Sequence, residues 1–243
     1  MIFISILLSF SFGKTISFAD SCYNARALHA KGDKADRAHI DKTIQAYRSL
    51  LSHPKYAERA AVGLIKSEYF RIRFATKSEK EKEKLTEHAK VLGDSLHKWF
   101  PKNKELTSIY VTLYSAWGAQ IGPLKAVKQG AAARVRDLAD SAKDYQILGR
   151  AHQLLPYIPL ILSWPEKQLA YKYLLLSLKE KPEDLYTYLF LAELYIDDSE
   201  YEKAKDIINK ALKRGIRNDF QLEDYRARYK LKDLLNKANK KSE

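Results

Sequence analysis

The chain has 243 residues, of which 46% are apolar and 30% are charged, and lysine plus arginine outnumber aspartate plus glutamate by 43 to 30. This balance is typical of a globular chain and excludes an intrinsically disordered one. Nine glycines and seven prolines are few for this length, which argues against a turn-rich β-sandwich. The single cysteine, Cys22, excludes a disulfide scaffold and a zinc site built from several cysteines.

Residues 2–12 form an apolar run that is too short to span a membrane, which takes roughly 18 such residues. A small–Phe–small sequence ending at Ala19 follows the run. Together they predict a secretory signal peptide over residues 1–19, with cleavage after Ala19. The alternative is a buried N-terminal helix. With the signal peptide, the mature domain would span residues 20–243 and be exported, periplasmic or associated with the envelope.

Cys22 comes just after the predicted cut. Lipid attachment to this cysteine is one alternative, and a free thiol near a mature N-terminus is the other. Asp20 stands where a lipoprotein signal has a small residue, so the sequence fits lipidation poorly.

From about residue 24 onward, apolar residues recur at helical spacing almost everywhere, and no strand-like alternation of useful length appears. The sequence therefore predicts an all-α domain of about eleven helices. Lysine and glutamate alternate between residues 77 and 90, as is typical of a solvent-facing helix surface. The predicted helices, in chain order, cover residues 40–51, a segment from 57, then 85–99, 106–117, one or two helices in 124–142, 144–155, 166–180, 183–196, 200–213 and 219–238.

The segment 154–165, LLPYIPLILSWP, differs from its neighbours because it combines three prolines with mostly apolar residues. Proline at this density excludes a helix interior. The segment is also too apolar for an ordinary solvated loop. We therefore expect it to pack down over an apolar surface.

Helices in pairs joined by short turns indicate a repeat, and residues 185–216 match the 34-residue tetratricopeptide pattern best. The preceding pair of helices matches with an interruption, because segment 154–165 lengthens its connection. We expect large and small side chains at fixed positions to pack the two helices of the best unit together: Tyr188, Leu191, Ala192, Tyr195, Ala204, Ile208 and Ala211.

The order of features resembles the T component of tripartite ATP-independent periplasmic (TRAP) transporters. The features are the helix segment 110–118 ending in Trp-Gly, then Leu-Gly-Arg at 148–150, the proline-bearing loop 156–165, and a well-formed unit from Pro182 to Glu193. The resemblance covers roughly residues 37–213. It implies a trimeric scaffold with an apolar internal pore, working with a periplasmic solute-binding protein.

No arrangement of residues typical of a catalytic, metal or cofactor site appears in the sequence. Arg150 needs a carboxylate or carbonyl partner if it is buried, so it is either a ligand contact or half of a salt bridge that braces the loop. Trp117, Tyr157 and Trp164 either line an apolar cavity or belong to the core.

The net charge of +13 is compatible with acidic proteins, anionic membranes or nucleic acid as partners, and export disfavours nucleic acid. The basic amphipathic segment 219–238 predicts a capping helix, with contact to anionic lipid or to an acidic partner as the alternatives. The sequence as a whole predicts a non-enzymatic exported scaffold that binds a partner protein, by resemblance a solute-binding protein. The alternative is a generic periplasmic tetratricopeptide adaptor in envelope assembly.

Overall fold

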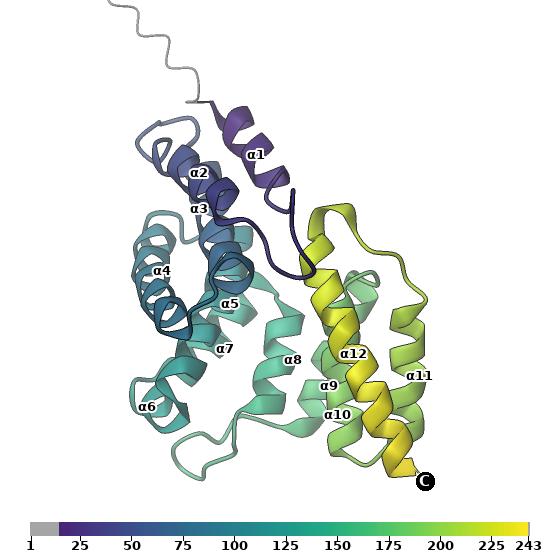
Figure 1. The fold of residues 1–243 in the computed structure, drawn as a ribbon. Coiled ribbons are helices and arrows are strands. Elements are labelled where there is room, and N and C mark those ends of the chain that lie inside the picture. Colours follow the sequence, from purple (N-terminus) through teal and green to yellow (C-terminus); the bar gives the residue numbers. More distant parts are fainter. Residues whose placement is uncertain (1–14, 243) are drawn as a thin grey trace, which may run out of the picture.

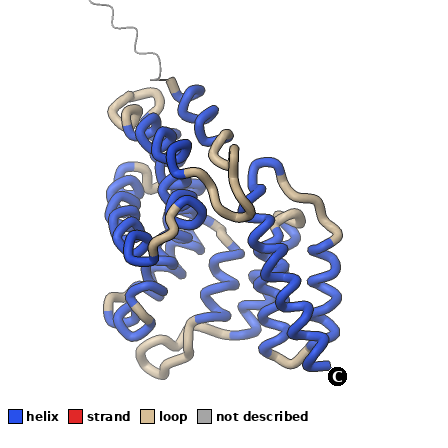
Figure 2. Tube along the Cα trace, in the orientation of Figure 1, coloured by secondary structure: helices blue, strands red, loops and turns tan. Residues whose placement is uncertain are grey.

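The computed structural model describes residues 15–242, which fold into helices joined by loops, without a β-strand in that range (Figures 1 and 2). None of these helices is long and apolar enough to cross a membrane. The predicted all-α helical solenoid is confirmed. The described residues form twelve α-helices, a π-helical turn and a 3-10 turn: α1 Ile16–Asn24, α2 Arg37–Arg48, α3 Ala57–Phe70, the π-turn Arg71–Ala75, α4 Glu79–Trp99, α5 Lys104–Ile121, α6 Pro123–Lys128, α7 Ala131–Ala142, α8 Tyr145–Leu154, α9 Lys167–Glu180, α10 Leu185–Asp197, α11 Tyr201–Leu212, the 3-10 turn Asn218–Phe220 and α12 Gln221–Ser242.

Helix α1 lies in the region where the sequence offered a buried N-terminal helix as the alternative to a signal peptide. Its Ile16 and Ala19 are buried with residues of α2 and α3. Cleavage after Ala19 would remove both side chains from this buried cluster and leave Asp20 as the first residue. The apolar run 2–12 of the predicted signal peptide lies outside the described residues, so export stays a prediction.

Short polar side chains set where several helices begin. Asp36, Asn103, Asp144 and Asp184 each accept a hydrogen bond from a backbone N–H in the first turn of the helix that follows. The C-terminal end of α5 is set by Gly122, whose φ of +86° favours glycine. The helix therefore continues past Gly118, where the sequence predicted a break.

Consecutive helices pack on one another through most of the chain: α2 on α3, α4 on α5, α5 on α7, α8 on α9, α10 on α11 and α11 on α12. Glycine lets three of these pairs come close, and in one of them Gly93 of α4 lies against the ring of Tyr110 of α5. Gly63 of α3 lies against the ring of Tyr47, and Gly149 of α8 lies against Leu174 of α9. The buried side chains form three main clusters, one near the N-terminus, one in the middle and one at the C-terminal end.

The two ends of the solenoid meet, which the sequence did not predict. The loop after α1 runs to the N-terminal half of α12 (Figure 1). There the buried Arg26 donates a hydrogen bond to the carbonyl oxygen of Asp219, and Arg226 of α12 forms an ion pair with Asp33 at 2.8 Å. Leu222 of α12 is buried in the N-terminal cluster. The last helix thus completes the core that the first helices begin.

Candidate functional site

Trp117, a predicted ligand or pore residue, lies in the packed middle cluster with 6% of its surface exposed. Its indole Nε1 donates a hydrogen bond to the Glu87 carboxylate of α4 at 2.5 Å. The ammonium of Lys90 lies 4.9 Å from the centre of the ring, within the range of a cation–π contact. These contacts occupy both the polar and the aromatic parts of the side chain, as in a core residue that joins α4 to α5.

Arg150 forms the ion pair that the sequence predicted, but its carboxylate partner is on another helix and not in the loop. The guanidinium pairs with Glu193 of α10 and donates a second hydrogen bond to Gln153 at 2.8 Å. It also lies over the ring of Phe190, 4.2 Å from its centre. Arg150 therefore connects α8 to α10.

Trp164 is half-buried where the loop meets α9, and its Nε1 is buried with no hydrogen-bond partner among the described residues. The ring lies edge-on to His152 of α8, with 5.0 Å between centroids. His152 accepts a hydrogen bond at Nδ1 from the backbone N–H of Glu166 at 3.0 Å. Burial lowers the pKa of His152, and Arg136 lowers it further while Glu166 opposes the shift. Trp164 and His152 line a hollow of about 400 Å³ and fix the end of the loop to α8.

The loop between α8 and α9, residues 155–166, is non-helical as predicted, but the expectation that it packs over an apolar surface is wrong for most of its length. We call it the exposed loop. Leu162 and Pro165 are buried, and Leu155 and Trp164 are partly buried against the middle cluster. Tyr157 is 62% exposed, Ile161 is 68% exposed and Leu160 is completely exposed.

Short-range backbone contacts explain why the apolar tip stays outside. Ile158 and Leu162 exchange two backbone hydrogen bonds of 2.8 and 2.7 Å, which close the tip into a compact turn. Leu160 at the tip has a φ of +66°, a strained conformation for a residue other than glycine. Strain of this kind is held in place by the surrounding structure and clusters at functional sites. The sequence showed the apolar character of the loop but not that the turn points it into solvent.

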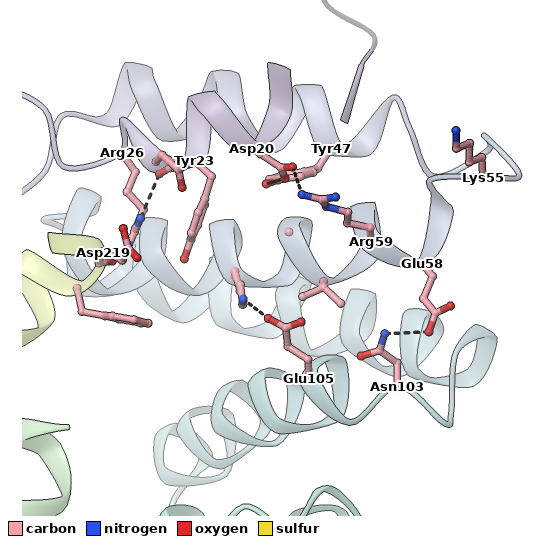
Figure 3. Close-up of a pocket in the computed structure, with 15 residues that line it drawn as sticks. Asp20, Tyr23, Arg26, Tyr47, Lys55, Glu58, Arg59, Asn103, Glu105 and Asp219 are labelled. Atoms are coloured by element: carbon pink, nitrogen blue, oxygen red, sulfur yellow. Dashed lines mark hydrogen bonds and ion pairs between the residues drawn. The ribbon is translucent and has the colours of Figure 1, made fainter. Parts of the chain in front are cut away.

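A separate polar cavity of about 710 Å³ lies between α1, α3 and the start of α5 (Figure 3). Its charged side chains are four acidic and four basic, and four of these eight form two ion pairs within the cavity. Asp20 accepts hydrogen bonds from the Tyr47 hydroxyl at 2.7 Å and from Arg59 at 2.5 Å, and Lys66 pairs with Glu105. Burial, with the hydrogen bond to Asp20, raises the pKa of Tyr47 well above its usual value. The formal charges of the cavity lining therefore sum to zero.

Cys22 is a free, partly exposed thiol on α1, so the structure places the predicted lipidation position inside a helix. Residues 15–242 contain no group of three or more His, Cys, Asp and Glu side chains that could hold a metal ion. The side chains of the best repeat unit are packed between α10, α11 and α12, with Tyr195 half-buried and the others buried: Tyr188, Leu191, Ala192, Ala204, Ile208 and Ala211.

The structure thus separates the predicted ligand residues: Trp117 is in the core, Arg150 connects two helices, Trp164 anchors the loop and Tyr157 is exposed on it. No protein-family model and no curated protein matches this chain. Among the described residues, Leu160 of the exposed loop is the most exposed large apolar side chain, and Tyr157 and Ile161 of the same loop also lie mostly in solvent.

Proposed function

We propose that this protein is a non-enzymatic helical scaffold that binds a partner protein through the exposed loop. The main support for this proposal is that Leu160, Ile161 and Tyr157 project into solvent together, next to Leu154, which is also exposed. Contiguous exposed apolar side chains mark interaction sites in soluble proteins. Segment 154–165 contains no charged residue, so the matching surface of the partner is an apolar groove.

The geometry of the loop supports recognition by shape. Its two ends are fixed by Trp164 and by the end of α8, and its tip is closed by the Ile158–Leu162 backbone pair. A pre-organised loop loses less conformational entropy on binding than a mobile one, which increases affinity. The strained φ of Leu160 is consistent with a side chain held in position for a partner.

The identity of the partner is a prediction from the resemblance to TRAP T components. In that form of the proposal the protein is exported, assembles as a trimer and binds a periplasmic solute-binding protein. The alternative form is a generic periplasmic adaptor in envelope assembly. Both use the same loop, and the mass of the bound partner separates them.

Photo-crosslinking in the native cells tests the proposal. A benzoylphenylalanine at position 160 or 161 should give a protein adduct of discrete mass, whereas the same group at Val91, which is exposed on α4, should not. Mass spectrometry of the adduct identifies the partner. Adducts to lipid only, or adducts of equal yield at position 91, would contradict the proposal.

A binding measurement with the identified partner gives a second test. The double variant Leu160→Ser, Ile161→Ser should weaken binding at least tenfold, because it removes the two most exposed apolar side chains of the loop. Val91→Ser is the matched control and should leave affinity unchanged. An adduct of twice the chain mass would assign the loop to self-association instead and would overturn the partner proposal.

A further inference from the structure

Four basic side chains of α8, α12 and the π-turn lie close enough to act on each other electrostatically. We call Arg73, Arg150, Arg226 and Lys230 the basic cluster. Arg226 of α12 donates a hydrogen bond at 2.9 Å to the carbonyl oxygen of Arg73 in the π-turn. Lys230 follows Arg226 by one helical turn, so both lie on the same face of α12. The helices α8 and α12 both pack against α10, which brings Arg150 toward Lys230.

The cluster holds more positive charge than its carboxylates balance. Arg226 pairs with Asp33 and Arg150 pairs with Glu193, whereas Arg73 and Lys230 form no ion pair with a described residue. Two cations are therefore left without a carboxylate.

The cations act on each other electrostatically. Partial desolvation lowers the pKa of Lys230, and Arg73, Arg226 and Arg150 lower it further, against the opposing effect of Glu193. An added anion would relieve this repulsion between like charges.

Among the four residues of the basic cluster, Arg73 gives the most direct evidence for a bound ligand. Its Nε is buried and has no hydrogen-bond partner among the described residues. A buried donor that lacks an acceptor is costly and calls for an explanation, such as a ligand. Burial opposes the charged form of Arg73, but Tyr69 and Tyr186 beside it outweigh this effect and raise its pKa. The Arg73 guanidinium therefore stays charged.

The backbone at Arg73 is also unusual. Residues 71–75 form a π-helical turn, a rare conformation that occurs frequently at functional sites. Segments distant in sequence hold this turn, because the carbonyl oxygen of Arg73 accepts from Arg226 and that of Phe74 accepts from the backbone N–H of Ala35 at 2.9 Å. Two guanidinium groups are fixed over aromatic rings at 4.2 Å, Arg226 over Phe74 and Arg150 over Phe190. The cluster is therefore pre-organised before any ligand binds.

We propose that the basic cluster binds a small divalent oxyanion. Two unbalanced cations match an anion of charge −2, and guanidinium groups match oxygen pairs of phosphate and carboxylate groups through paired N–H donors. This inference is independent of the exposed loop and holds whether or not the loop binds a partner.

Calorimetric titration of the full chain with inorganic phosphate, and separately with succinate, tests the proposal at constant ionic strength. We expect each anion to bind at one site per chain. A titration with sodium chloride is the control for a monovalent anion. Lys230→Gln should weaken the affinity at least tenfold, and because Lys230 is exposed this variant should fold. Lys237→Gln, exposed on the same helix, is the matched control and should bind as the parent does.

Arg73→Gln should abolish binding, with its folding checked by circular dichroism. The absence of saturable binding of both anions, or equal binding by Lys230→Gln and Lys237→Gln, would overturn the assignment. If vesicles of phosphatidylglycerol sediment the parent protein but not Lys230→Gln, the cluster binds a lipid headgroup. That result would also overturn the proposal of a small free anion.

Discussion

Gly149 of α8 lies so close to Leu174 of α9 that a β-carbon on residue 149 would come within 2.6 Å of the Leu174 Cγ and 3.0 Å of its backbone nitrogen. The backbone nitrogen cannot move away without displacing α9. The closeness of these two helices therefore depends on a glycine at 149, and this pair of helices supports both ends of the exposed loop.

Gly149→Ala should lower the free energy of unfolding by about 1–3 kcal/mol because of overpacking, which outweighs the gain in helix propensity of up to about 1 kcal/mol. Urea unfolding followed by circular dichroism measures this. Gly118→Ala is the matched control: it lies inside α5, and a β-carbon there meets nothing within 4 Å, so stability should rise by about 0.5–1 kcal/mol. A rise in both variants would show that the α8–α9 contact tolerates a methyl group.

Asp224 is fully buried in α12 and holds Arg217 through three donors. It accepts from the Arg217 backbone N–H at 2.9 Å and from the guanidinium Nη2 and Nε at 2.6 and 3.0 Å. Asp224→Asn should destabilise the fold by about 3 kcal/mol, because it leaves the half-buried Arg217 with only the more distant carboxylate of Asp184, at 3.5 Å. The same urea unfolding experiment measures the loss. Asp206→Asn removes an exposed partner of Lys210 and should change stability little; equal effects of the two variants would contradict the prediction.

Glu223 lies 3.9 Å from Arg26, and its Oε2 is buried without a hydrogen-bond partner among the described residues. Burial raises the pKa of Glu223, and Arg26 only partly opposes the shift. The folded protein therefore binds the proton of the Glu223 carboxyl group more tightly than the unfolded chain does. The contribution to stability is present below the ordinary pKa of about 4.5 and is lost as pH rises through the raised value.

Glu223→Gln should consequently gain stability relative to the parent as the pH is raised from about 4 to 7. Urea unfolding at several pH values gives the difference directly. Glu202→Gln, exposed on α11, is the reference for removing a glutamate. If the free-energy difference between Glu223→Gln and the parent stays constant with pH, the burial argument fails.

For His152 we expect the opposite dependence of stability on pH. Because burial lowers its pKa, the unfolded chain binds this proton more readily, and stability should fall as pH drops from about 6.5 through the lowered value. His152→Asn offers an acceptor to the Glu166 N–H without titrating, so its stability should fall less over the same range. Urea unfolding between pH 7 and 5 measures both proteins. His88→Asn, exposed on α4, should follow the parent; a His152→Asn profile that also follows the parent would refute the prediction.

The helix positions could be predicted because the three-to-four-residue spacing of apolar side chains is a local signal. Proline and the helix-capping residues limit the ends, as at Asp144 and Gly122. The error at Gly118 has a physical reason: a single glycine weakens a helix by only about 1 kcal/mol, which packing on α4 and α7 outweighs.

The surfaces were predicted less well because they depend on contacts distant in sequence. Hydrophobicity predicted burial of the segment around Leu160, but the Ile158–Leu162 backbone pair closes the turn in solvent. Arg150 was singled out correctly as a residue in need of a partner, but Glu193 lies 43 residues away. Arg73 carries no local signal, because its importance comes from a π-turn and from α12 at the other end of the chain.

The contact between the first loop and α12 has a consequence for how the chain comes apart. In an open solenoid each repeat touches only its neighbours, so unfolding can begin at either end and proceed stepwise. Here Arg26 with Asp219 and Arg226 with Asp33 join segments 193 residues apart. Fraying of α12 would expose the N-terminal cluster around Leu222, and fraying of the N-terminal loop would free α12. We therefore expect α12 and the N-terminal helices to unfold as one cooperative unit, so that a truncation at one end should destabilise the other.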